Sequence, residues 1–190
     1  HSNTTGFSNI AVGRNALLCS TTARCNVAVG YAALRFATGG ECNVAVGTAT
    51  LFYNTTGTRN VAIGHKALQQ NTIGCRYTAV GAGALRRNTT GIHNEAVGYY
   101  TLANNTTGIR NTGAGFEALY CNTTGIQNAS FGAYSLFDNT TGNCNAALGV
   151  RALQNNTTGY RNTALGFYTM AANTTGVRNV ALGRSSMIFN

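Results

Sequence analysis

The chain has 190 residues, of which 44% are hydrophobic and 9% are charged, with 24 glycines, no proline and no tryptophan. This hydrophobic content is too high for an intrinsically disordered chain, and no apolar run reaches the roughly 18 residues that a membrane-spanning helix needs. Thirteen Lys and Arg residues against four acids give a net charge of +9, which either favours a polyanionic partner or serves only solubility and repulsion between fibres.

An internal repeat of 17 residues runs through the whole chain. Eleven glycines, from Gly13 to Gly183, each end an A-x-G-like triplet and follow one another at intervals of 17 residues without an insertion. The consensus is N-T-T-G-x-x-N-x-A-x-G-x-x-A-L-x-x. The sequence therefore predicts one repeat array over residues 1–190, and we expect this array to be a window on a longer one.

The length of the repeat indicates the fold class. Helical repeats of about 34 to 47 residues and leucine-rich repeats of 20 to 29 residues do not fit a period of 17. Collagen needs glycine at every third residue, and a coiled coil needs heptads. We therefore expect an all-β, parallel β-solenoid with one repeat per coil. Eleven coils stacked at the parallel-strand spacing of about 4.8 Å would span roughly 50 Å.

Most repeats begin with the turn motif N-T-T-G. Asparagine and glycine tolerate a positive φ, and asparagine side chains cap turns. The first threonine of the motif is present in all eleven repeats, from Thr4 to Thr174. The same motif forms N-glycosylation sequons, for example at Asn54 and Asn105, although turn formation explains it equally.

A second asparagine column precedes the A-x-G triplet. It runs from Asn9 to Asn179 and is broken only by Tyr77. Amides stacked at the spacing of parallel strands hydrogen-bond to one another along the stack. We expect such a ladder here.

Two bulky apolar columns are the predicted core. One lies directly before the repeat glycine, as at Val12 and Val29, and the other is a leucine column four residues after it, as at Leu17 and Leu34. We expect these columns to face each other, with the alanines between them on the outside, where they allow another chain to approach. In the alternative, the small residues line a thin interior and the valine and leucine columns form an interface.

The N-x-A-x-G core, as in residues 43–47, resembles the head repeat of YadA-like trimeric autotransporter adhesins. The longer unit, as in residues 54–68, resembles repeats of phage and giant-virus tail-fibre proteins. The resemblance covers essentially the whole chain. It implies a homo-oligomeric β-roll, with a trimer favoured, in an extracellular, cell-surface or virion fibre used for attachment. The expected partners are further copies of the chain, and host-surface polymers such as acidic glycans.

The residue five positions before each repeat glycine is often basic. Stacking puts these side chains in one row, where like charges about 5 Å apart repel unless they splay into water or an external anion bridges them. The row predicts either a solvated edge or a binding site for an acidic glycan; nucleic acid is a less favoured partner. The polyanion-binding candidates are Arg59, Arg76, His93, Arg110, Arg161 and Arg178.

Aromatic residues gather in the turn after the repeat glycine. Exposed rings there could stack on sugars, but tyrosine and phenylalanine are also enriched at protein interfaces, which is the interpretation that we favour. The candidates are Tyr99, Tyr100, Phe116, Tyr134, Phe167 and Tyr168.

Three cysteines are disulfide candidates. Cys25 and Cys42 occupy the same column in adjacent coils, within the Cα separation that a disulfide allows, and Cys19 lies at the same corner and competes with them. A disulfide would indicate an oxidising, extracellular setting. We expect no metal site and no cofactor.

The sequence does not indicate an enzyme. Glu117 and Asp138 lie in adjacent coils but four columns apart, too far for the paired carboxylates of a glycosidase. The function that we expect is a structural fibre, adhesin or tail-fibre stalk. The alternatives are an ice-binding solenoid, which the threonine column suggests, and a polyanion- or glycan-binding module.

Overall fold

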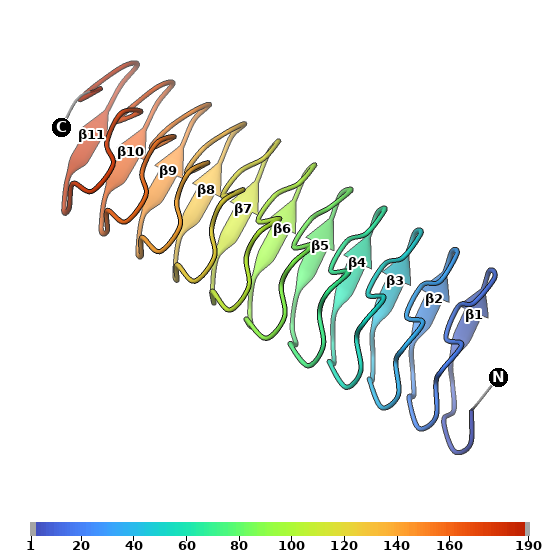
Figure 1. Ribbon diagram of the computed structural model, residues 1–190. Helices are drawn as coiled ribbons and strands as arrows, with labels where there is room; N and C mark the ends of the chain where they lie inside the picture. Colours follow the sequence, from blue (N-terminus) through green and yellow to red (C-terminus); the bar gives the residue numbers. More distant parts are fainter. Residues whose placement is uncertain (1–2, 189–190) are drawn as a thin grey trace.

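The computed structural model describes residues 3–188, which form a parallel β-solenoid with one 17-residue repeat per coil (Figure 1). Each coil contributes one three-residue strand to a single sheet, in which the strands follow their order in the sequence. The strands are β1 (Ile10–Val12), β2 (Val27–Val29), β3 (Val44–Val46), β4 (Val61–Ile63), β5 (Thr78–Val80), β6 (Glu95–Val97), β7 (Thr112–Ala114), β8 (Ala129–Phe131), β9 (Ala146–Leu148), β10 (Thr163–Leu165) and β11 (Val180–Leu182).

The register of the sheet follows the repeat without a shift. Ala28 of β2 pairs with Ala45 of β3, and the same offset of 17 residues holds for the other strand pairs. Outside the strands, the backbone N–H of Leu34 donates to the carbonyl oxygen of Thr50 in the next coil at 3.0 Å. The prediction of a parallel β-solenoid, in which equivalent residues stack in columns, is therefore confirmed.

The core differs from the predicted one. Side chains directly before the repeat glycine are exposed or half-buried, with 57% of Val12 and 50% of Leu148 accessible, whereas Ala28 and Ala96 in the middle of their strands are completely buried. The prediction that the valine and leucine columns face each other is wrong, because only the leucine column lies inside. The alternative prediction is correct in placing the small alanines in a thin interior, and wrong in placing the leucines outside it.

The thin interior explains this arrangement. Alternate residues of a strand point to opposite sides, so each three-residue strand can turn either its middle side chain or its two flanking ones inward. The leucine column already fills the interior opposite the sheet: Leu34, Leu85 and Leu136 are all completely buried. Alanine leaves room for leucine there, and two β-branched residues per strand would not.

Each coil turns through left-handed backbone conformations. Leu34 has a φ of 49° and Leu119 a φ of 54°, and the same region recurs at two further positions in most coils, as at Arg59 with 58° and Tyr134 with 57°. A left-handed conformation costs an L-residue roughly 1–2 kcal/mol. Complete burial of a leucine side chain contributes about 1.5–3 kcal/mol, which offsets that cost at the leucine column.

Two asparagine ladders run through the interior. In the column that precedes the strands, Nδ2 of Asn43 donates to Oδ1 of Asn26 at 3.0 Å and to the carbonyl oxygen of Gly57 at 2.9 Å. In the column that opens the N-T-T-G turn, Nδ2 of Asn122 donates to Oδ1 of Asn105 at 2.7 Å. The predicted ladder is confirmed, and the turn asparagines form a second one that the sequence analysis did not foresee.

Tyr77 interrupts both ladders. Its side chain is buried, and its hydroxyl accepts a hydrogen bond from Nδ2 of Asn88 at 2.7 Å. Asn88 is thereby drawn away from Asn71, whose Oδ1 is left without a hydrogen-bond partner. Burial raises the pKa of the Tyr77 phenol far above its usual range, so this residue stays neutral.

Candidate interaction surfaces

The outward side of the sheet is an apolar strip along the whole solenoid, which we call the outer sheet face. It consists of the first and third residues of each strand, since only the middle residue points inward. Its exposed large apolar residues are Ile10, Val12, Val61, Ile63, Val97, Phe131, Leu148, Leu165, Val180 and Leu182. The largest exposed apolar patch of a protein is often a functional one, so the face has the character of an interface.

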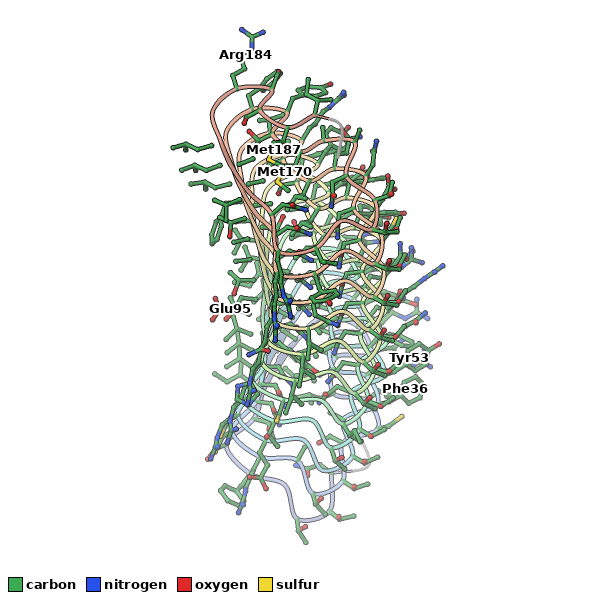
Figure 2. All side chains as sticks on the ribbon, turned by 90° about the vertical axis from the view of Figure 1, so that its left-hand side faces the viewer. Phe36, Tyr53, Glu95, Met170, Arg184 and Met187 are labelled. Carbon is green, nitrogen blue, oxygen red and sulfur yellow. The ribbon has the colours of Figure 1, made fainter. Side chains whose placement is uncertain are left out.

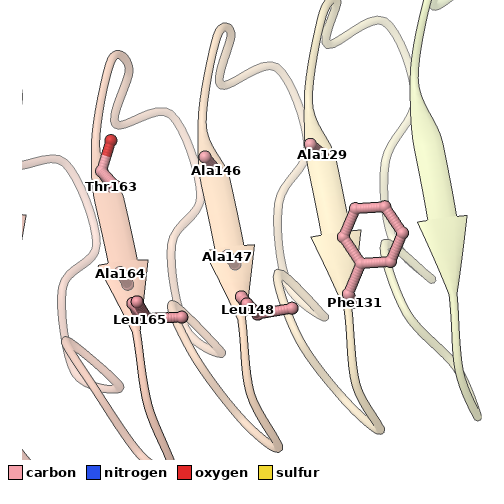
Figure 3. A pocket seen from close by; sticks show the side chains of 8 residues that line it. All are labelled: Ala129, Phe131, Ala146, Ala147, Leu148, Thr163, Ala164 and Leu165. Carbon is pink, nitrogen blue, oxygen red and sulfur yellow. The ribbon is translucent and has the colours of Figure 1, made fainter. Parts of the chain in front are cut away.

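A shallow hollow of about 460 Å³ lies on this face over β8 to β10 (Figure 3). Phe131, Leu148 and Leu165 form one side of it, where the strands end. The strands begin with the smaller Ala129, Ala146 and Thr163, which leave the opposite side more open. The hollow could therefore receive an apolar ridge of a partner.

One carboxylate interrupts the apolar strip. Glu95 opens β6 and projects outward from the sheet, on the side of the solenoid opposite to Phe36 and Tyr53 (Figure 2). Thr78 and Thr112 pair with it in the neighbouring strands. The strip is thus divided into an N-terminal and a C-terminal apolar part.

The aromatic candidates form contacts along one corner beside this face. The rings of Tyr99 and Phe116 are stacked with centroids 5.3 Å apart, and Phe116 packs edge-on against Tyr134 at the same distance. Phe167 contacts Tyr168 at 4.6 Å. These rings extend the apolar surface of the outer sheet face around the corner, since 48% of Tyr99, 43% of Phe116 and 44% of Phe167 is exposed.

Further aromatic residues join these contacts from another column. Tyr120 stacks on Phe137 at 5.3 Å, and Phe137 reaches Tyr134 at 5.7 Å. They do not stand out in any single column of the repeat, because their contacts join two columns. Their positions, five residues after the repeat glycine in successive coils, were the available signal.

A separate aromatic group lies in the N-terminal coils, on the side of the solenoid opposite to Glu95 (Figure 2). The ring of Phe36 stacks parallel to that of Tyr53 at 5.8 Å, and the guanidinium of Arg35 lies 5.1 Å from the Phe36 centroid. This group, too, combines residues of two columns and does not stand out in either one alone. It borders an open hollow of about 540 Å³, together with Thr38, Thr55, Gln70 and Thr72.

The predicted basic row exists as an exposed edge. Its six members, Arg59, Arg76, His93, Arg110, Arg161 and Arg178, are all exposed, and they stack in register with Gln127 and Cys144 between Arg110 and Arg161. Nη1 of Arg76 lies 3.3 Å from Nε2 of His93. Among residues 3–188 the ion pair found joins Arg24 to Glu41, at 2.8 Å, so no carboxylate neutralises the row.

The threonine column that suggested ice binding is used inside the chain. The hydroxyl of Thr106 donates to the carbonyl oxygen of Thr123 at 3.1 Å, and that of Thr123 donates to Thr140 at 3.1 Å. The same bond recurs from coil to coil along the column. This use of the hydroxyl protons does not favour the ice-binding alternative.

The turn asparagines are buried although they head sequons. Asn54, Asn105 and Asn156 are completely buried and take part in the interior ladder. A glycan on such an amide would have to pass through the coil. The folded chain therefore has no room for glycosylation at these positions.

The six cysteines are free thiols in this structure. Cys25 and Cys42 are exposed in adjacent coils, held in register by a parallel bridge between Arg24 and Glu41. Cys121 is half-buried, and burial, followed by the nearby carboxylates of Asp138 and Glu117, raises the pKa of its thiol. Burial also raises the pKa of Asp138.

Mild oxidation with glutathione disulfide should join Cys25 to Cys42. The exposed thiols can exchange with the reagent and then with each other, because strand stacking places their Cα atoms about 4.8 Å apart.

Cys121 should react with iodoacetamide more slowly than the exposed Cys25 and Cys42, since its raised pKa leaves less thiolate. Peptide mapping by mass spectrometry measures both. Labelling of Cys121 before the exposed cysteines would contradict the predicted order of reactivity.

Within residues 3–188 no group of three or more His, Cys, Asp or Glu side chains is placed to hold a metal ion. The described part of the chain also has no helix that is long and apolar enough to cross a membrane.

Comparisons with protein-family models, with curated proteins and with solved structures give no match for this chain.

Proposed function

We propose that this chain is a segment of an extracellular structural fibre used for attachment, in which three copies pack together through their outer sheet faces. The observation that carries the proposal is the largely apolar outer sheet face, which Glu95 divides into an N-terminal and a C-terminal part. The strip is about 50 Å long and about 10 Å wide, or roughly 500 Å² before the aromatic corner is added. A typical monomer has a largest apolar patch of about 300–600 Å², often a functional one.

A repeating face suits association between copies of the same chain. Because side chains recur at every coil, a contact that is favourable at one coil is available again at the next, and the contributions add along the solenoid. The aromatic corner supplies the residue types that are enriched at protein interfaces. Three copies, and the extracellular setting, are proposed from the resemblance to YadA-like heads and tail-fibre repeats.

The assembly can be tested by measuring molar mass with light scattering. The unaltered chain should have three times the chain mass of 19.8 kDa. Replacing Leu148 and Leu165 by glutamate should reduce this to the mass of one chain, because each assembled copy would bury two carboxylates without partners, at several kcal/mol for each ion.

The matched control replaces Thr141 and Thr158 by glutamate. These exposed threonines lie in the same two repeats but outside the outer sheet face, and the substitution adds the same charge. The control should keep the full mass, and negative-stain images of it should show rods. A monomeric unaltered chain, or equal dissociation of both variants, would refute the proposed packing.

A further inference from the structure

We infer that the C-terminal end of the basic row, with Tyr160 and Asn143 beside it, is a binding site for a linear acidic polysaccharide. This inference deepens the proposed attachment function by naming the class of ligand. The residues of this site lie outside the outer sheet face, so ligand binding can be tested independently of assembly.

The site is a hollow of about 410 Å³ on the surface of the last three coils. Its lining residues are Asn143, Cys144, Tyr160, Arg161 and Arg178. Unlike the other parts of the basic row, this end thus combines two adjacent arginines with a concave surface, an aromatic ring and a side-chain amide.

Backbone pairing holds the two arginines at neighbouring levels. The N–H of Arg161 donates to the carbonyl oxygen of Asn143 at 2.9 Å, and the N–H of Arg178 donates to that of Tyr160 at 3.0 Å. Both residues have a left-handed backbone, with φ of 57° and 59°, so they leave the coil in the same direction. Their Cα atoms are one coil apart, about 4.8 Å.

The charges of these arginines are not compensated within the described chain. The ion pair among residues 3–188 lies at Arg24 and Glu41, nine and eight repeats away from Arg178. Two guanidinium groups one coil apart repel each other, and a carboxylate placed between them would turn that repulsion into two charge-assisted hydrogen bonds. The arrangement therefore selects an anionic group.

Tyr160 and Asn143 favour a sugar as the carrier of that group. The Tyr160 ring is 39% exposed, and the guanidinium carbon of Arg161 lies 6.0 Å from its centroid, so the ring borders the charged site. Oδ1 of Asn143 accepts the N–H of Ile126 at 2.7 Å, which fixes the orientation of this amide beside the hollow. An aromatic face and an oriented amide are suited to the C–H face and the hydroxyls of a pyranose.

Single-stranded nucleic acid fits less well. Its binding proteins offer an aromatic platform to each successive base. Along the column next to the basic row, the residues of the four coils before Tyr160 are Ile92, Ile109, Ile126 and Asn143, none of which is aromatic. One aromatic ring beside two arginines matches a sugar that carries a carboxylate. The other basic residues of the row offer contacts to further carboxylates of the same polysaccharide.

Binding of polygalacturonate to the assembled protein at about 0.15 M ionic strength tests the inference. Replacing Arg161 and Arg178 by glutamine should weaken the affinity about tenfold, because a charge-assisted contact is lost at each position. The control replaces Arg14 and Arg87 by glutamine; these exposed arginines lie outside the row, and the net charge changes equally. The control should lose less than about twofold. Equal losses, or no loss in either variant, would show that no site exists here.

The variant Tyr160→Ala separates a sugar from an anion of any kind. It should weaken binding of polygalacturonate and leave binding of inorganic polyphosphate unchanged. If both polymers are affected alike, or neither is, the saccharide assignment is overturned. Light scattering on the same samples should give an unchanged mass, so that loss of the site and loss of the proposed assembly are distinguished.

Discussion

Replacing Asn122 by aspartate should destabilise the solenoid by about 3–5 kcal/mol at neutral pH. The side chain is completely buried, and its Nδ2 donates to Oδ1 of Asn105 at 2.7 Å and to the carbonyl oxygen of Gly125 at 3.2 Å. A carboxylate would direct negative charge at both of these acceptor oxygens. The hydrogen bond from Asn139 to Oδ1, at 2.8 Å, would remain and would not compensate for it.

The loss should shrink as the pH is lowered. Burial and two facing oxygens raise the folded-state pKa of the new carboxyl above its unfolded value of about 3.9. The folded state then binds the proton more tightly than the unfolded state, so stability rises as the pH falls through the raised pKa toward about 4. The protonated carboxyl can donate to Asn105 and restore the ladder.

Urea unfolding followed by circular dichroism, at pH 7 and at about pH 4.5, measures both effects. Asn155→Asp is the control, because it makes the same chemical change at an exposed position and should shift stability by less than about 0.5 kcal/mol. The unaltered chain contains Asp138, whose pKa is also raised by burial. The stability of each variant must therefore be compared with that of the unaltered chain at the same pH. Equal behaviour of the two variants would mean that the ladder contributes little.

Replacing Gly132 by alanine should destabilise the chain by about 3 kcal/mol or more. Gly132 has a φ of 130°, and a Cβ there would lie 2.6 Å from the carbonyl oxygen of Gly149 in the next coil. The strained backbone and the collision with main-chain atoms both oppose the substitution. Neither can be relieved by a side-chain movement.

The control is the repeat glycine of the last coil. Gly183 has a φ of 111°, but a Cβ there would meet no atom within 4 Å. Gly183→Ala should therefore cost only the backbone strain, about 1–3 kcal/mol. Comparing the urea midpoints of the two variants isolates the effect of stacking. If the midpoints move equally, close approach between coils is not the reason for the glycine column.

Much of the fold could be predicted from the repeat. The period of 17, together with glycine, asparagine and threonine in fixed columns, excluded helical repeats and indicated one coil per repeat. The asparagine ladder before the strands and the exposed basic row followed from the stacking of equivalent residues. These features were accessible because in a solenoid a spacing along the sequence becomes a neighbour relation in space.

The tertiary structure alone decided which side of each strand is buried. Val12 and Ala11 alternate in the same way whichever of them faces inward, so the pattern of one strand is ambiguous. The outcome depended on the left-handed turn at the leucine column, which a propensity argument does not assign to leucine. That turn brings Leu34 and its equivalents into the interior, and the space left beside them admits only a small residue from the strand, which is alanine except at Gly113 and Ser130. For the same reason the valines form the outer sheet face, and the aromatic contacts between columns emerge only when the coil is closed.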